Sequence, residues 1–146
     1  MAKSSWRPAH IPDLTGKTIL VTGANSGIGL EAVKLFAANG AEVILACRNT
    51  AKAEAAVEQV REQTPDARLI VMPLDLADLA SVKAFVVALK ERISKLDVLL
   101  NNAGIPGDRT RQVFGTFDQD VFDQVMHVNV MGPLKTAVAF MDNVAA

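Results

Sequence analysis

The sequence predicts an α/β fold in which a doubly wound parallel sheet of about four strands, in the order 3-2-1-4, has helices on both faces. Short apolar runs alternate with longer stretches of helix-forming residues, and the connections between them are short. The apolar runs are continuous, as is typical of strands that are buried on both sides. A glycine-rich turn links the first run to the first helical stretch, and right-handed crossovers then give the doubly wound order.

Each expected element follows from the residues that form it. The four strands are runs rich in Val, Ile and Leu, at residues 18–21, 42–46, 68–72 and 98–100. The helices between them carry apolar residues at helical spacing, at residues 29–38, 51–63 and 79–93. Gly40 ends the first helix, Asn49 offers a cap to the second, and Pro65 follows the end of the second.

Beyond the fourth strand we expect a loop at residues 105–115 and one long helix over residues 118–141. Gly132 and Pro133 interrupt that helix, and the proline is expected to kink or divide it. No fifth strand is expected after it. We therefore predict an N-terminal lead-in at residues 1–16 and one domain at residues 17–146, with an incomplete sheet and a truncation after the long helix.

The 146 residues are half apolar and carry a formal net charge of −1, which predicts a single globular domain. This balance gives no electrostatic reason to expect nucleic acid or an anionic membrane as a partner, and no apolar run is long enough to span a bilayer. The single cysteine, Cys47, favours a reducing, cytoplasmic compartment and indicates a small buried residue instead of a reactive thiol. His10 and His127 lie far apart outside any ligand pattern, so no metal site is expected.

The stretch Thr-Gly-Ala-Asn-Ser-Gly-Ile-Gly at residues 22–29 organises the rest of the chain. It places backbone N–H groups at the start of a helix, where the partial positive charge favours phosphate. Gly23 and Gly27 suit a tight turn or a positive φ, and Gly29 allows a strand or a diphosphate to approach closely. The spacing differs from both the Gly-x-Gly-x-x-Gly pattern and the P-loop. A purely structural tight turn is the alternative.

This turn, together with Asn-Asn-Ala-Gly at residues 101–104, resembles the short-chain dehydrogenase/reductase family, and the resemblance runs from about Asp13 to the last residue. It implies a Rossmann-like NAD(P)-binding domain over residues 17–146, in which the turn holds the dinucleotide. The cofactor-binding residues that it implies in the turn are Thr22, Gly23, Asn25, Ser26, Gly27, Ile28 and Gly29.

The end of the second strand bears on the choice between NADP and NAD. NAD-preferring proteins usually place a carboxylate about 20 residues beyond the glycine turn, whereas the sequence here reads Ala-Cys-Arg-Asn at residues 46–49. The planar guanidinium of Arg48 is suited to a ribose 2′-phosphate. The alternative is an ordinary exposed arginine near a helix start. We predict NADP rather than NAD.

Two further segments follow the later strands. Taken alone, Asp75 is either a helix cap or a ligand, and the resemblance implies that it accepts a hydrogen bond from the adenine amino group, with Leu76 near the ring. The segment at residues 101–104, taken alone, is a polar turn. The resemblance implies that it stabilises the sheet and that Asn101, Ala103 and Gly104 line the cofactor ribose.

Asn129 lies on the last helix, where an asparagine is usually a solvated or capping side chain. The resemblance implies that it organises a proton-relay water and supports a catalytic lysine, with Val128 near the nicotinamide. The family also uses a serine and a Tyr-x-x-x-Lys pair, but this sequence has no tyrosine and no serine after Ser94. Asn129 is therefore the one catalytic position of the family that this sequence matches.

These observations predict the NADP(H)-binding part of a short-chain oxidoreductase that interconverts small-molecule alcohols and carbonyls, and that is inactive by itself. The alternatives are a non-catalytic dinucleotide-binding sensor or regulatory module, and an inactive remnant. An open sheet edge at the fourth strand and an apolar stripe on the last helix also predict self-association.

Overall fold

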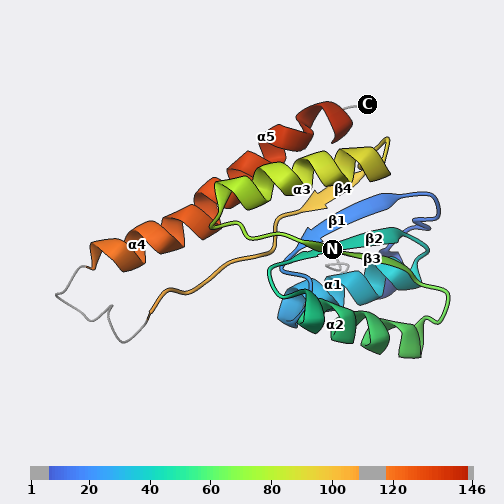
Figure 1. Ribbon diagram of the computed structural model, residues 1–146. Coiled ribbons are helices and arrows are strands. Elements are labelled where there is room, and N and C mark those ends of the chain that lie inside the picture. Colours follow the sequence, from blue (N-terminus) through green and yellow to red (C-terminus); the bar gives the residue numbers. More distant parts are fainter. Residues whose placement is uncertain (1–6, 109–117, 145–146) are drawn as a thin grey trace, which may run out of the picture.

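The computed structural model describes residues 7–108 and 118–144. Four parallel strands form one sheet in the order β3-β2-β1-β4 (Figure 1), which confirms the predicted fold class and strand order. The strands are β1 (Thr18–Thr22), β2 (Glu42–Cys47), β3 (Arg68–Pro73) and β4 (Val98–Leu100). β4 has its predicted bounds, and each of the others runs one residue further. Across the described ranges, no helix combines the length and the apolar character needed to cross a membrane.

The parallel register brings the carboxyl ends of the strands to one edge of the sheet. Thr22 of β1 pairs with Ala46 of β2, and Val21 pairs with Leu100 of β4. The chain leaving each strand therefore enters the same region. Functional sites of doubly wound sheets lie at this edge, where the strand order reverses, and here the reversal falls between β1 and β4.

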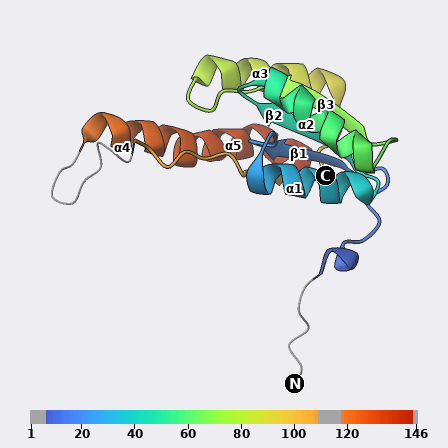
Figure 2. The same cartoon turned by 90° about the horizontal axis from the view of Figure 1, so that it is seen from below.

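Helices cover both faces of the sheet. The first three are α1 (Gly27–Ala38), α2 (Thr50–Gln63) and α3 (Leu79–Arg92). α1 and α2 lie on one face, and α3 lies on the other beside the C-terminal helix (Figures 1 and 2). The Asn49 side chain accepts a hydrogen bond from the Lys52 N–H at 2.9 Å, which confirms the predicted cap of α2. Gly40 follows the end of α1 and has φ +89°. Helices often end in this way, because glycine adopts a positive φ without steric cost.

Alternate residues of β1 supply two apolar cores. Ile19 and Val21 face α1 and α2, whereas Leu20 faces α3 and the C-terminal helix. In the second core, the rings of Phe85 and Phe140 meet edge to face with centroids 6.4 Å apart. Because β1 is buried on both sides, it holds the glycine turn that follows it on a rigid support.

The predicted long helix is divided into three parts: α4 (Gln119–Met126), a π-helical turn (His127–Met131) and α5 (Gly132–Val144). The division next to Gly132 and Pro133 was predicted, but the π-helical turn upstream of it was not. Proline has no N–H for the carbonyl four residues earlier, so regular α-helical bonding fails just before it. α4 projects beyond the sheet (Figures 1 and 2).

Two predicted segments are only partly described. Of the loop at residues 105–115, the structure describes residues 105–108, which form no regular element, and the rest lies outside the described residues. Of the lead-in, residues 7–16 are described and contain one 3-10 turn, Pro8–His10.

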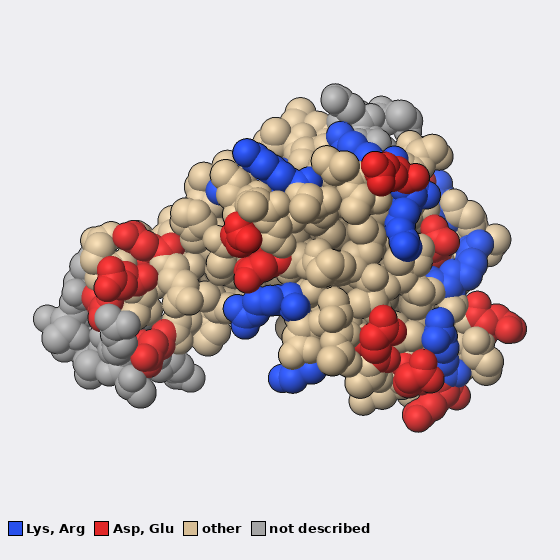
Figure 3. All heavy atoms as spheres, viewed as in Figure 1, with Lys and Arg blue, Asp and Glu red and all other residues tan. Residues whose placement is uncertain are grey.

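Acidic side chains gather on α4, whereas both signs of charge are interspersed over the rest of the visible face (Figure 3).

Candidate functional site

A polar hollow of about 300 Å³ lies at the carboxyl edge of the sheet. Its walls come from the ends of all four strands and from α4 and the π-helical turn. Nine residues that the sequence singled out line it together: Thr22, Gly23, Asn25, Arg48, Asp75, Leu76, Ala103, Gly104 and Val128. The fold therefore brings most of the predicted site into one place.

The other predicted site residues lie around this hollow. Ser26 and Gly27 line an adjacent hollow of about 350 Å³ between the glycine turn and α2. Ile28 is 83% exposed at the start of α1, and Gly29 is buried behind the turn. Asn101 and Asn129 line neither hollow.

Two glycines of the turn have conformations that favour glycine. Gly23 has φ +64°, and a Cβ there would lie 2.8 Å from the Cα of Ala103, so the turn packs directly on the segment after β4. Gly27 has φ +56°, but a Cβ there would enter open space. The close packing at Gly23 is structural, whereas the space beside Gly27 is open.

Gly29 serves close packing and not an unusual φ. A Cβ at this position would meet the Nδ2 of Asn102 and the carbonyl oxygen of Gly23, which lies 2.5 Å from the added atom. The start of α1 can therefore rest on β1 and on the segment after β4 only because this residue has no side chain.

The start of α1 differs from the starts of the other described helices that begin after loops. The side chains of Asn49, Asp78 and Asp118 accept backbone hydrogen bonds at the starts of α2, α3 and α4. Ser26 occupies the same position at α1 and makes no such bond. Because the first N–H groups of a helix have no partner within it, those of α1 face the turn with their partial positive charge uncompensated.

Asn102, which the sequence reasoning did not include among the site residues, connects the segment after β4 to the glycine turn. Its Nδ2 donates to the carbonyl oxygens of Thr22 and Gly23, at 3.1 and 3.2 Å. The hydroxyl oxygen of the buried Thr22 accepts the N–H groups of Asn102 and Ala103, at 3.1 and 3.0 Å. Asn102 directly precedes Ala103 and Gly104, and this position in the sequence was the signal that could have predicted its place in the site.

Asn101 points to a different partner. Its Oδ1 accepts a hydrogen bond from the hydroxyl of the buried Thr136 at 2.9 Å, which ties the end of β4 to α5. We predicted Asn101 to line the cofactor ribose, but the structure places it outside the hollow.

The two charged residues predicted for the site both border the hollow. Arg48 is exposed directly after β2 and makes no ion pair within residues 7–108 and 118–144. Asp75 uses one carboxylate oxygen to accept the N–H of Ala77 at 2.9 Å, and Asp78 is the residue that caps α3. The second carboxylate oxygen of Asp75 is therefore available for a donor in the hollow.

Cys47 lies at the end of β2 and is 2% exposed, as predicted for a small buried residue. Burial raises the pKa of its thiol, and the backbone N–H groups of Ala24 and Asn25, which hydrogen-bond to the sulfur, act in the opposite direction. The side chain thus supports the glycine turn from beneath.

Asn129 lies in the π-helical turn and pairs with one residue of the loop. Its Oδ1 accepts the Ile105 N–H and its Nδ2 donates to the Ile105 carbonyl, both at 2.8 Å. These two hydrogen bonds hold the chain in place directly after Gly104, where it leaves the segment at residues 101–104. The Asn129 side chain therefore holds the backbone of Ile105 through both of its polar atoms.

Lys52, Ile105 and Gln124 also border the hollow, and the sequence reasoning did not name them. Gln124 precedes Val128 by four residues, so helical spacing was a usable signal for it. Lys52 lies in the first turn of α2, four residues after Arg48. Ile105 gave no signal, because its place depends on the path of an irregular segment.

Among the described residues, no three His, Cys, Asp or Glu side chains are grouped as metal ligands.

Comparison with known proteins gives one consistent result. A family model described as short chain dehydrogenase matches residues 17–146. Human dehydrogenase/reductase SDR family member 13 is 43% identical over 122 residues, covering 83% of this chain and 30% of the relative. Human WW domain-containing oxidoreductase is 53% identical over 91 residues, covering 62% of this chain and 22% of the relative.

Solved structures agree with this result. A short chain dehydrogenase from Escherichia coli CFT073, solved in complex with NADPH, superposes with a TM-score of 0.79 at 32% identity, covering 90% of this chain and 55% of that one. Levodione reductase superposes with a TM-score of 0.81 at 32% identity, covering 89% of this chain and 50% of that one. The chain thus spans about half the length of these structures and less than a third of the two curated relatives.

Proposed function

Because the chain belongs to the short-chain dehydrogenase family, we propose that residues 17–146 are the part of an NADP(H)-dependent oxidoreductase that holds the nicotinamide dinucleotide. The bound cofactor would supply a hydride donor or acceptor, and the whole protein would interconvert small-molecule alcohols and carbonyls. The observation that carries this proposal is the uncapped start of α1 beside the open space at Gly27. The hollow that Gly27 lines adjoins the hollow of Arg48 and Asp75, because Asn25 and Lys52 line both.

The residues present suit the parts of a dinucleotide. The free N–H groups at the start of α1 would hold the diphosphate, with Gly27 leaving room for it. The free oxygen of Asp75 would accept the adenine amino group, beside the apolar side chain of Leu76. Ala103 and Gly104 would lie beside a ribose and Val128 toward the nicotinamide, since all three line the same hollow as Asp75 and Leu76.

The preference for NADP rests on Arg48. Residues 46–49 contain no carboxylate that would accept from a ribose 2′-hydroxyl. Arg48 borders the hollow with its charge unpaired by any described residue, and a planar guanidinium matches the geometry of a phosphate. The NADPH complex of the Escherichia coli neighbour supports this reading.

A fluorescence titration of the wild-type chain and Arg48→Asp with NADPH and NADH tests the cofactor preference. The wild type is expected to bind NADPH more tightly than NADH, and Arg48→Asp is expected to lose or reverse that preference. A preference for NADPH that Arg48→Asp leaves unchanged would contradict the assignment of Arg48 to the 2′-phosphate.

We further propose that this chain binds the cofactor without turning over substrate. Proton transfer to a carbonyl oxygen needs an acid whose pKa is brought near the working pH, and the sequence contains no tyrosine to serve as the family's acid. The side chain of Asn129 hydrogen-bonds to the backbone of Ile105. A carboxamide is not an ionisable group, so it cannot serve as that acid. Following NADPH absorbance with a panel of ketones and aldehydes should show no consumption, and sustained consumption by purified chain would refute this part.

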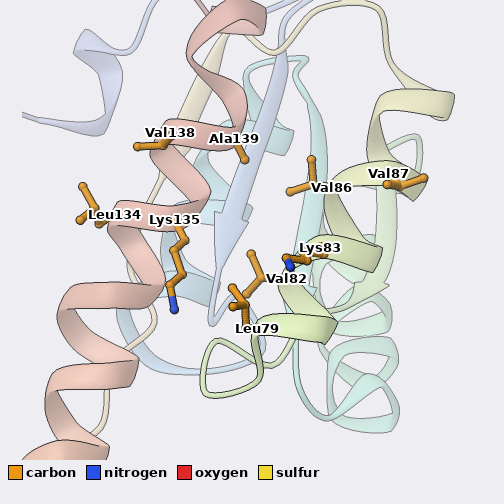
Figure 4. Close-up of a pocket in the computed structure, with 9 residues that line it drawn as sticks. All are labelled: Leu79, Val82, Lys83, Val86, Val87, Leu134, Lys135, Val138 and Ala139. Atoms are coloured by element: carbon orange, nitrogen blue, oxygen red, sulfur yellow. The ribbon is translucent and has the colours of Figure 1, made fainter.

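Self-association is proposed through the outer surface of α3 and α5. An apolar groove of about 640 Å³ runs between these helices, with Leu134 and Val138 on one wall and Val87 on the other (Figure 4). These three side chains are 54, 59 and 61% exposed, and exposed apolar patches commonly mark interaction sites. Light scattering should give a mass above that of one chain, and the substitution Leu134→Glu should lower it. A monomer mass for the wild type at every accessible concentration would count against the proposal.

A further inference from the structure

Gly132, the first residue of α5, is buried against the turn at residues 75–78, which connects β3 to α3. A Cβ at position 132 would lie 2.9 Å from the Cβ of Leu76 and 3.3 Å from its Cγ and Cδ2. The Cβ of Leu76 is fixed by its own backbone, so a change of rotamer cannot relieve the closest of these contacts. A side chain at position 132 would therefore force either α5 or the turn to move.

Leu76 borders both Gly132 and the polar hollow. Its side chain is 7% exposed and lines the hollow next to Asp75. Gly132 does not line the hollow, although Val128 of the preceding helical turn does. The contact between Gly132 and Leu76 thus sets how closely α5 approaches the turn, and with it the place of Leu76 and Asp75 in the hollow.

Of the two segments, α5 is the more firmly held. Thr136 is buried one turn into the helix, and its hydroxyl donates to the Oδ1 of Asn101 at 2.9 Å. Phe140 is fully buried and meets the ring of Phe85 edge to face. The turn at residues 75–78, by contrast, lies at the surface, and its last two residues are exposed. A collision at position 132 is therefore expected to move the turn and to leave the helix in place.

The turn is expected to move as a unit, because Asp75 organises it. The Asp75 N–H donates to the Ser81 hydroxyl oxygen at 2.9 Å, and the Asp75 carboxylate accepts the Ala77 N–H at 2.9 Å. The Asp75 carbonyl oxygen accepts the Asp78 N–H at 3.2 Å. A shift of Leu76 would carry Asp75 with it, and the free carboxylate oxygen would leave its place at the hollow.

We propose that Gly132 is a positioning residue for the adenine end of the dinucleotide. Because Gly132 has no side chain, α5 holds the turn where Asp75 can accept the adenine amino group and Leu76 can lie against the ring. Gly132 acts through Leu76 and does not touch the cofactor. This inference rests on the proposed function.

The test is a fluorescence titration of the 146-residue chain with NADPH and with reduced nicotinamide hypoxanthine dinucleotide phosphate, in which a carbonyl oxygen replaces the adenine amino group. The wild type is expected to bind NADPH about tenfold more tightly than this analogue, because the Asp75 carboxylate loses a donor. Gly132→Ala is expected to raise the Kd for NADPH about tenfold and to leave that for the analogue within about twofold. The higher helix propensity of alanine offsets part of the collision, so the variant is expected to fold.

Two controls separate positioning from stability. Phe140→Leu removes core volume from the same helix and lies outside the hollow, so it should lower the free energy of unfolding and leave the ratio of the two Kd values as in the wild type. Leu76→Gly removes the atoms with which the new Cβ collides. Adding Gly132→Ala to Leu76→Gly should therefore change neither Kd by more than about twofold.

A Gly132→Ala variant that keeps the wild-type ratio, or that weakens both cofactors equally, would overturn the proposal. A variant that does not fold would assign the glycine to the fold alone and overturn it too, as would a further loss of binding when Gly132→Ala is added to Leu76→Gly. If the wild type binds NADPH and the analogue equally, Asp75 has no role at the adenine and the proposal falls. A wild type that binds neither refutes the proposed function itself.

Discussion

The two edges of the sheet differ in how their charged groups are paired: they are paired at the amino edge and, in the part of the chain that the structure describes, unpaired at the carboxyl edge. At the amino edge, the carboxylate of Asp97 accepts the Thr18 N–H at 2.9 Å and the Lys17 ammonium at 3.0 Å. This ties β1 to the start of β4, and the charges satisfy one another. At the carboxyl edge, the start of α1 has no side-chain cap, and Arg48 and Lys52 have no charged partner within the described residues.

This difference indicates which groups stabilise the fold and which are available to a ligand. Folded proteins pair nearly all their buried polar groups, and exposed charges near each other are usually paired or dispersed. At the carboxyl edge, the polar groups of Thr22 and Asn102 are paired with each other and hold the turn in place. The donors that face outward are left free. The following substitutions test whether the two sets of groups are separable.

The largest effect is expected for Gly29→Ala. The added Cβ would collide with Asn102 and with the Gly23 carbonyl, so the turn and the segment after β4 would have to separate. Overpacking of this kind should lower the free energy of unfolding by about 2 kcal/mol or more, measured by urea denaturation. Wild-type stability in Gly29→Ala would show that the turn is not packed as described.

Asn102→Ala should come next. It removes the bonds to the carbonyls of Thr22 and Gly23 and leaves both acceptors beneath the turn, at a cost of about 1–2 kcal/mol. Asn101→Ala is the matched neighbour, since it loses only the Thr136 hydroxyl as a partner. It should cost less than Asn102→Ala in the same denaturation series. The reverse order would contradict the assignment of Asn102 as the residue that connects the two segments.

The smallest effect concerns the amino edge and depends on pH. The Thr18 N–H, followed by the Lys17 ammonium, holds the pKa of Asp97 below its usual range. A carboxyl with a lowered folded-state pKa stabilises the protein above its unfolded pKa, near 4, and loses that contribution as the pH falls through the folded value. Asp97→Asn should therefore be less stable than the wild type at pH 7, and the gap should close below about pH 4. A gap that widens toward acid would contradict this reading, and NADPH binding at pH 7 should be unaffected in either case.

The sheet was predictable because each strand is a continuous apolar run that ends in a residue of a different kind. Pro73 follows the third run and Asn101 the fourth, so the strand ends could be placed within one residue. The turn at residues 22–29 was predictable as a unit, because glycine readily adopts the positive φ that Gly23 and Gly27 have in the structure.

The parts that could not be predicted depend on contacts between segments far apart in the sequence. The pairing of Asn129 with Ile105 requires the path of the chain after residue 104, and no local pattern fixes that path. The two adjacent asparagines at positions 101 and 102 have the same local propensity. Only the packing of α5 on one side and of the glycine turn on the other gives them different partners.

We propose above that the glycine turn holds the diphosphate of a nicotinamide dinucleotide. Gly27 and Gly16 provide a matched pair at the two edges of the sheet. Both have a positive φ, +56° and +79°, and a Cβ at either meets nothing within 4 Å. Gly27→Ala and Gly16→Ala should therefore cost similar stability, about 1–2 kcal/mol each.

Isothermal titration calorimetry of NADPH into the wild type, Gly27→Ala and Gly16→Ala is the most direct test. The wild type and Gly16→Ala are expected to bind NADPH with similar affinity, and Gly27→Ala at least about tenfold more weakly, because the added methyl would occupy the space proposed for the diphosphate. Folded, monodisperse wild type that gives no heat with NADPH at millimolar concentration, or a Gly27→Ala variant that binds as tightly as the wild type, would contradict it.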